Sequence, residues 1–328
     1  VGGAISLWLW PNTLPLLFKD ILFVGPVYVA FFLFAMHELR RVTVPRSLTL
    51  TMLLLALIVF LQMFNPNLDN VLVGAVGAKV WLFYLPLVFV GAAAIRTRDD
   101  LIRMLRVIVV IAIVPCAVGL VQWGLSNAIG YRRAIELFYG AAAAAATQQF
   151  GRFDFGTDLF RIPSTFTFIA GYSGFTLSML VPTYALIRLD PSPMWRRFGR
   201  VMLGVVIVSA LLSGARANFI FVPLLMALIL ALDARLKGIV AGLLLLPPFL
   251  LAVLEVSGLR LSAIVTGTGT LVSHYKSDLI IPAVIDAMRS WPMGQGSGMN
   301  TGAARHVMSA VAAQRFSPVE SYYARAII

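Results

Sequence analysis

The chain has 328 residues and a formal net charge of +12, and it is 60% hydrophobic but only 12% charged. A soluble domain carries about 25% charged residues and cannot bury so much apolar surface, so a cytosolic enzyme, a disordered chain and a fibrous protein are excluded. The composition predicts an all-α polytopic integral membrane protein.

Uncharged or nearly uncharged segments recur at the length of a membrane span, which needs about 20 residues. Lys79 is the only charge in the segment 70–95, and Arg216 is the only charge in the segment 201–232. Residues 1–18 and 319–328 are expected to belong to further spans, with both ends of the chain truncated. In chain order, the predicted spans are residues 21–36, 47–68, 70–95, 107–131, 162–187, 201–232 and 238–254.

Basic residues gather in four connections, at residues 40–46, 96–106, 188–200 and 235–237. Because basic residues collect on cytoplasmic loops, we place these four connections in the cytoplasm, and the charge gives no reason to infer a nucleic-acid partner. The alternate connections are then external. We expect a transmembrane bundle over 1–255 with an external loop at about 126–161, a folded periplasmic loop domain over 256–318, and the start of a further span at 319–328.

The segment 201–232 has a cytoplasmic connection on both sides, so it must cross the membrane an even number of times. We therefore predict two short helices of about 16 residues each, or about 24 Å. Ser213-Gly214-Ala215 would form the turn between them, because small residues and glycine allow a tight reversal. Arg216 would then lie at the external tip. In the external loop at 126–161, the Ala141–Ala146 run predicts a helix.

Three basic residues could bind a phosphate. The planar guanidinium of Arg216 suits bidentate phosphate binding, and its small neighbours leave room for a ligand; the alternative is a headgroup anchor. Lys79 lies within a predicted span, where a charge is costly and is by default a candidate functional residue. The alternative is that its side chain snorkels to the membrane interface. Arg161 is either a ligand or a positive residue at a helix start.

The remaining chemistry-bearing residues lie late in the chain. Gly294-Gln295-Gly296-Ser297-Gly298 follows no predicted strand, so it is either a turn that approaches a phosphate or sugar, or a flexible turn. Glu320 is either a general base or a carboxylate in the first turn of a helix, where it would interact favourably with the helix dipole. His306, beside Arg305, is a second candidate base. Cys116 is the only cysteine, and the histidine spacing predicts no metal site.

Three segments, taken in order, resemble the O-antigen ligase and Wzy-type O-antigen polymerase superfamily over residues 161–328. The first is Leu212-Ser213-Gly214-Ala215-Arg216-Ala217, which is similar to the family's Ser-Gly-Ser-Arg-Gly-type segment at a helix turn. The second is the large external loop with its glycine-rich stretch at 294–298. The third is Val319-Glu320-Ser321-Tyr322-Tyr323, which is similar to the motif that opens the next span.

The resemblance implies a metal-independent and cofactor-free glycosyltransferase of GT-C-like fold in the bacterial inner membrane, with its active site facing the periplasm. Its substrate would be an oligosaccharide linked to undecaprenyl diphosphate, and a chain-length regulator protein would be a partner. The diphosphate ligands would be Arg216, Arg161, Lys79 and Arg305, with Glu320 or His306 as the base.

Two alternatives to a polymerase stay open. The ligases, which transfer polysaccharide to lipid A core or another acceptor, carry His-Asn or His-Ser where this chain has Glu320-Ser321, and this departure favours a polymerase. The other alternative is a transporter or flippase for lipid-linked oligosaccharide. Such a protein should carry charged, broken segments near mid-membrane in two related halves, whereas here the spans are mostly uncharged and the unusual residues gather on one face.

Overall fold

The computed structural model describes residues 2–9, 22, 24–35, 45–148, 161–167, 169–215, 218–232, 285, 288–289 and 294–298, and over these residues the regular structure is all helical. The chain divides into two compact units: unit 1 comprises residues 1–16 and 97–268, and unit 2 comprises residues 17–96 and 269–328. Two helical segments, Val71–Ala94 and Arg98–Ile129, are long and apolar enough to cross a membrane. The helical class is confirmed, and the expected domain boundary at 255–256 lies outside the described residues.

Among the described helices of unit 1, α6 (Arg98–Ile129) is the longest, and it begins nine residues before the predicted span at 107–131. Thr97 and Asp100 form a capping box that fixes this start, because the Thr97 hydroxyl accepts from the Asp100 N–H at 3.1 Å and the Asp100 carboxylate accepts from the Thr97 N–H at 3.0 Å. Most of the basic connection at 96–106 is therefore helical rather than an open loop.

The predicted split of 201–232 into two helices is confirmed. After α9 (Ile169–Leu189), helix α10 (Pro193–Leu212) and helix α11 (Asn218–Leu232) follow, with the turn at the expected position. α10 has 20 residues rather than about 16, because proline is favoured in the first turn of a helix and Pro193 starts it early. At 1.5 Å per residue, α10 spans about 30 Å and α11 about 22 Å.

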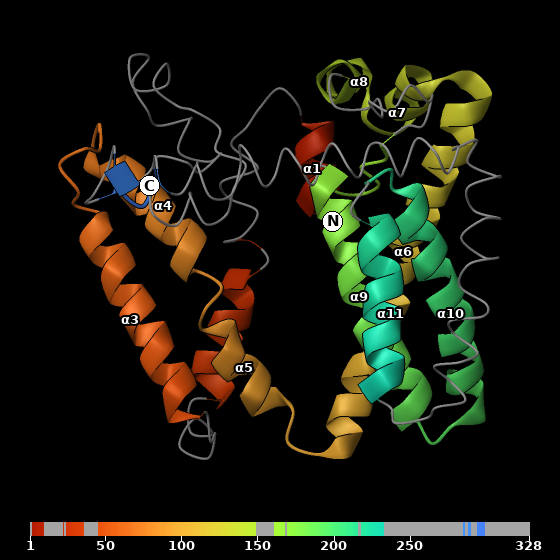
Figure 1. Cartoon of the computed structure of the whole chain (residues 1–328), viewed down its shortest axis with the longest axis horizontal. Coiled ribbons are helices and arrows are strands. Elements are labelled where there is room, and N and C mark those ends of the chain that lie inside the picture. Colours follow the sequence, from red (N-terminus) through yellow and green to blue (C-terminus); the bar gives the residue numbers. More distant parts are fainter. Residues whose placement is uncertain are drawn as a thin grey trace. The chain divides into compact units, whose positions relative to one another are not determined.

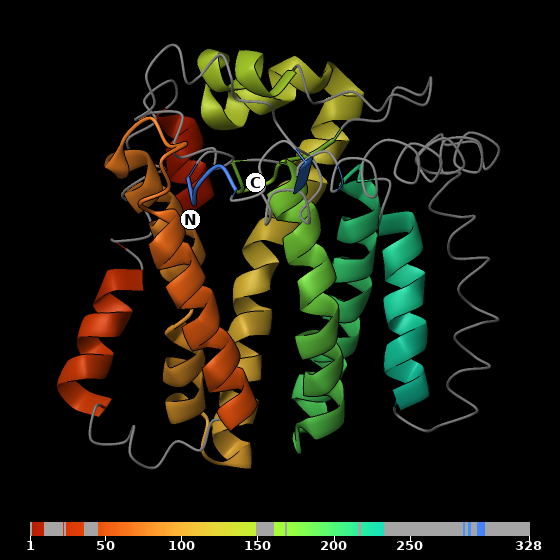
Figure 2. The ribbon, with the colours of Figure 1, turned by 60° about the vertical axis from the view of Figure 1, so that its left-hand side comes forward.

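Within unit 1, α6, α9, α10 and α11 stand side by side (Figures 1 and 2). Their shared core is apolar, while their outer faces expose large apolar side chains such as Val114 (59% exposed) and Leu224 (59% exposed). A contiguous apolar exterior is typical of helices that face lipid. The buried members of the core are Cys116, Leu180, Val206, Ala210, Leu211, Leu212, Phe219 and Val222.

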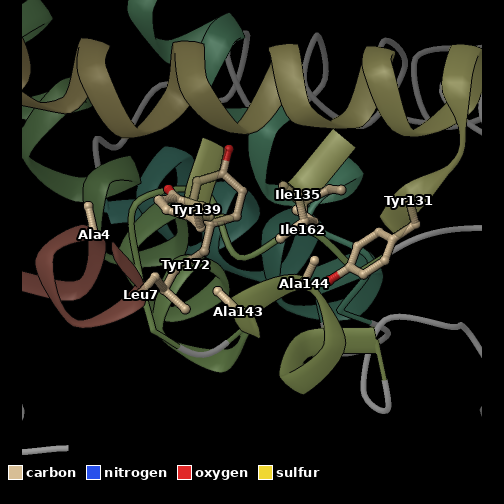
Figure 3. Close-up of a cluster of buried hydrophobic side chains, with 9 residues drawn as sticks. All are labelled: Ala4, Leu7, Tyr131, Ile135, Tyr139, Ala143, Ala144, Ile162 and Tyr172. Atoms are coloured by element: carbon tan, nitrogen blue, oxygen red, sulfur yellow. The ribbon is translucent and has the colours of Figure 1, made fainter. Parts of the chain in front are cut away.

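Two short helices, α7 (Tyr131–Tyr139) and α8 (Ala141–Gln148), lie across the ends of the upright helices of unit 1 (Figures 1 and 2). α8 confirms the helix predicted from the alanine run. α7 is amphipathic, with Arg132 and Arg133 exposed and an apolar face buried against α1 (Gly2–Trp8) and α8 (Figure 3). This buried cluster comprises Ala4, Leu7, Tyr131, Ile135, Tyr139, Ala143, Ala144, Ile162 and Tyr172.

Unit 2 contains helical residues 24–30, which run into the π-helical turn η1 (Phe31–Ala35), and then α3 (Arg46–Gln62), α4 (Val71–Leu82) and α5 (Leu87–Ala94). α4 and α5 together make up the predicted span 70–95. They are separated by a turn at 83–86, which hydropathy does not reveal. Pro86 has no N–H for a helical hydrogen bond, and the Tyr28 hydroxyl donates to the Phe83 carbonyl in the turn.

Candidate functional site

The turn between α10 and α11 is held by buried side-chain hydrogen bonds. The Asn218 amide donates to the Ala210 carbonyl at 2.7 Å and to the Ser213 hydroxyl at 3.1 Å, and the Ser213 hydroxyl donates to the same carbonyl at 2.7 Å. The Asn218 oxygen accepts from Ser173 of α9 at 2.9 Å. Gly214 has a φ of +76°, which lets the chain reverse. The described residues of the turn are therefore held in place by hydrogen bonds on both sides of residues 216–217.

Residues 161–167 lie directly against this turn. The Ile162 N–H donates to the Ser213 carbonyl at 3.2 Å, and Ile162, Pro163 and Ser164 are all buried. The structure thus brings the segment that follows Arg161 onto the turn that leads into Arg216, 55 residues later in the sequence. Arg161 itself is half-buried.

Ser164 is the structural centre of the 161–167 segment. It has a φ of +51°, a conformation that costs a non-glycine residue about 1–3 kcal/mol and persists only where its surroundings fix it. Its carbonyl accepts from Gln122 Nε2 of α6 at 3.4 Å and from the Tyr139 hydroxyl of α7, and its own hydroxyl donates to the Pro115 carbonyl at 2.6 Å. These bonds tie the segment to α6 and α7.

Tyr139 remains a hydrogen-bond donor at any physiological pH. Burial raises the pKa of its phenol to about 12, an effect that Gln122 partly offsets. The sequence pattern did not point to Tyr139, Gln122 or Asn218 as functional residues. Only the position of Asn218, two residues after Arg216 at the start of α11, could have suggested a role in the turn.

Lys79 belongs to unit 2, where it lies in the last turn of α4. It is half-buried, and its ammonium nitrogen is 6.0 Å from the centroid of the Phe83 ring, a cation–π distance. Arg216, Arg305, His306 and Glu320 lie outside the described residues. Among the residues that are described, no three His, Cys, Asp or Glu side chains come together as a metal site would require.

The glycine-rich loop 294–298 packs against the connection between α3 and α4 within unit 2. The side-chain amides of Asn65 and Asn67 donate to the Gly294 carbonyl at 3.1 and 2.9 Å. The Ser297 N–H donates to the Gln62 carbonyl at 3.2 Å, and the Ser297 hydroxyl donates to the Gly74 carbonyl at 2.9 Å. The loop is therefore hydrogen-bonded to its neighbours, and the Ser297 N–H is already bonded to a backbone carbonyl.

Close backbone packing explains the glycines on both sides of this contact. A Cβ on Gly77 would lie 2.0 Å from the Ser297 oxygen, and a Cβ on Gly298 would lie 1.9 Å from the Val73 oxygen. Neither position tolerates a side chain without movement of the backbone. The glycines of α4 were the signal in the sequence: Gly77 packs against the loop 294–298, and Gly74 packs against Met63 and Leu68.

Comparisons with models of known protein families, with curated proteins and with solved structures give no match to this chain. The resemblance to O-antigen ligases and polymerases therefore depends on the three sequence segments alone. Function has to be inferred from those segments together with the geometry of the α10–α11 turn and of residues 161–167.

Proposed function

We propose that this protein is a multi-pass inner-membrane glycosyltransferase that polymerises undecaprenyl-diphosphate-linked oligosaccharide units at the periplasmic face. The observation that carries the proposal is the hydrogen bond from Ile162 N–H to the Ser213 carbonyl. It joins the segment beginning at Arg161 to the turn that leads into Arg216. Arg161 and Arg216, which we propose as ligands of one diphosphate, are therefore one and three residues in the sequence from two residues, Ile162 and Ser213, that are hydrogen-bonded to each other.

The chemistry needs charge stabilisation and one base. The acceptor hydroxyl attacks the anomeric carbon of the donor sugar, the bond from that carbon to the diphosphate oxygen breaks, and the diphosphate leaves with the electron pair. Arginines at the diphosphate would stabilise its developing charge. Glu320, or alternatively His306, would take the proton of the acceptor hydroxyl as it attacks. Lys79 and Arg305 are kept as further diphosphate ligands by the resemblance alone.

The rigidity of the turn supports this role. A group that stabilises a transition state must be held before the reaction, because reorganising it during the step would cost free energy. Asn218 bonds to Ala210 of α10, to Ser213 in the turn and to Ser173 on α9, so three hydrogen bonds fix described residues that precede and follow Arg216 in the sequence. A headgroup anchor at a lipid interface would need no such scaffold.

The positions of the basic residues support a periplasmic site. The turn lies at one end of α10, and the arginines of residues 188–200 lie at the other end. If the basic end faces the cytoplasm, the turn faces the periplasm, where a lipid-linked donor replaces a nucleotide sugar. The finer architecture that we propose is a GT-C-like bundle with a periplasmic loop domain over 256–318 and a chain-length regulator protein as partner.

The test is incubation of the purified protein with an undecaprenyl-diphosphate oligosaccharide, followed by separation of the products by length. The wild type should give a ladder, Arg216→Ala should give none, and Arg161→Ala should slow extension about tenfold or more. Arg132→Ala is the matched control, because Arg132 is an exposed arginine of α7 in the same unit. Unchanged polymer from Arg216→Ala, with normal membrane insertion, would refute the diphosphate role.

The same assay separates the alternatives and tests the base. Transfer of sugar only onto added lipid A core would mean a ligase, whereas binding without any product would favour a transporter or flippase. Glu320→Gln should abolish extension while His306→Ala retains it. The opposite pattern would make His306 the base.

A further inference from the structure

Three helix ends of unit 1 bring seven arginines together at the end of α10 away from the α10–α11 turn. Arg98 Nη2 of α6 donates to the Leu189 carbonyl at 3.2 Å, where α9 ends. Deeper in α6, Arg106 binds the Asp190 carboxylate through Nε at 2.7 Å and through Nη2 at 2.9 Å. The seven residues, which we call the arginine surface, are Arg98, Arg103, Arg106, Arg188, Arg196, Arg197 and Arg200.

Acidic residues neutralise only part of this surface. Residues 97–106 and 188–200 together contain seven arginines and three aspartates, which leaves a net charge of +4. Asp190 forms an ion pair with Arg106, and the Asp190 side chain has no exposed area. Asp100 forms an ion pair with Arg103 at 3.0 Å. Arg197 and Arg200 are exposed and form no ion pair with any residue that the structure describes.

The arrangement along α10 favours an external anion. Arg196 and Arg200 are four residues apart on one helix, where like charges are neighbours and repel each other, and Arg197 adjoins them. A planar guanidinium forms paired hydrogen bonds with phosphate oxygens, and several arginines close together favour an anionic phosphate over a carboxylate of the same chain.

Apolar surface begins directly beside these charges. Met194, next to Trp195 and Arg196, is 66% exposed, and Val201, next to Arg200, is also 66% exposed. On α6, Val107 follows Arg106 and is 57% exposed. An occupant that combines phosphate with hydrocarbon at adjoining positions would contact both kinds of side chain. A phospholipid has this arrangement, whereas free phosphate and nucleic acid do not.

The Arg106–Asp190 pair positions the surface. The Arg106 guanidinium lies 5.0 Å from the centroid of the Trp195 ring, and Asp190 also accepts from the Ser192 N–H at 2.8 Å. One buried carboxylate thus links α6 to the turn that starts α10. The exposed arginines of α6, α9 and α10 are consequently held at one end of the unit.

We propose that the arginine surface binds the phosphate groups of anionic phospholipids, with the acyl chains along the exposed apolar faces of α6 and α10. The proposal depends on a membrane location but not on the proposed glycosyltransferase chemistry, so either can fail without the other. Each basic residue near an anionic membrane surface contributes about a fivefold gain in affinity, so three arginines together contribute about 100-fold.

The test measures lipid binding to the purified full chain in detergent by native mass spectrometry and by melting temperature. The probes are phosphatidylglycerol, phosphatidylcholine and glycerol phosphate. The wild type should retain and be stabilised by phosphatidylglycerol only, less so at high salt. The triple variant Arg196→Gln, Arg197→Gln, Arg200→Gln should lose binding about 100-fold. The double variant Arg132→Gln, Arg133→Gln, on the exposed face of α7, is the matched control.

A variant with lysine at the same three positions keeps the positive charge, and it should retain most of the binding. It therefore distinguishes loss of charge from misfolding caused by three substitutions. Equal stabilisation by phosphatidylcholine would overturn the proposal, as would full binding by the triple glutamine variant. Equal stabilisation by glycerol phosphate would show a free-anion site, and tighter binding of an RNA oligonucleotide would show a nucleic-acid surface. Either result would also overturn it.

Discussion

Replacing Gly77 by alanine should loosen the contact between α4 and the loop 294–298. The new Cβ would lie 2.0 Å from the Ser297 oxygen and 2.4 Å from Gly298 Cα, against an ordinary contact of 3.4 Å. The loop would have to retreat by about 1.4 Å, the difference between 3.4 and 2.0 Å. Hydrogen bonds that now measure 2.9–3.2 Å would then exceed hydrogen-bonding distance.

The expected cost follows from those bonds. Four hydrogen bonds hold the loop, from Asn65, Asn67, the Ser297 N–H and the Ser297 hydroxyl. At about 0.5–1.5 kcal/mol each, their loss would weaken docking of the loop by about 2–6 kcal/mol. Alanine is a better helix former than glycine by about 1 kcal/mol, so a net loss of about 1–5 kcal/mol remains.

Hydrogen exchange of the Ser297 amide, together with the melting temperature of the purified protein, measures this change. Gly91→Ala in α5 is the matched control, because no atom lies within 4 Å of its Cβ position, and it should leave exchange unchanged while slightly raising the melting temperature. Slow Ser297 exchange and an unchanged melting temperature in Gly77→Ala would refute the packing argument.

Two further predictions concern titratable groups of unit 1. Hydrogen bonds from Arg106 lower the pKa of Asp190 below its usual value of 3.8, so the stabilisation is present above pH 4 and is lost as the pH falls through the folded value. Asp190→Asn should lower the melting temperature at neutral pH and should make the melting temperature fall less steeply below pH 4. The control Asp99→Asn, at an exposed position, should behave as the wild type. An Asp190→Asn variant with the melting temperature of the wild type would contradict a stabilising role of the Arg106–Asp190 ion pair. Burial raises the pKa of Tyr139 to about 12, so the unfolded chain loses this proton first and stability should fall between pH 10 and 12. Absorbance titration should show a tyrosine that ionises near pH 12 and that is lost in Tyr139→Phe, and an unchanged titration in that variant would exclude the assignment.

Local patterns predicted most of the described helices. The position of the α10–α11 turn followed from the charge asymmetry of the loops, and helix α8 followed from the alanine run, because both depend on residues close in sequence. The start of α6 at Arg98 was missed, although Thr97 and Asp100 have the capping-box spacing, because the arginines between 96 and 106 suggested a loop. The interruption before α5 was also missed, because hydropathy does not register the missing N–H of Pro86.

The candidate site was predicted only as separate residues. Arg161 and Arg216 were chosen because each is a charge in apolar surroundings. The sequence pattern did not predict that residues 161–167 contact the α10–α11 turn. The contact between Ile162 and Ser213 joins positions 51 residues apart. Tyr139 and Gln122 were not chosen at all, because a tyrosine or a glutamine gains a role only from the carbonyl that it reaches, here that of Ser164.

The sequence by itself determined the class of the protein, since a chain with 60% hydrophobic and 12% charged residues has to put its apolar surface against lipid or a large apolar core. It also determined particular helix boundaries, such as the capping box that starts α6 and the turn before α5, because caps and prolines act on their immediate neighbours. Only the tertiary structure decided which segments meet: 161–167 on the α10–α11 turn, 294–298 on α4, and Arg106 on Asp190. Such contacts depend on the relative placement of helices, and that placement depends on packing between residues far apart in the chain.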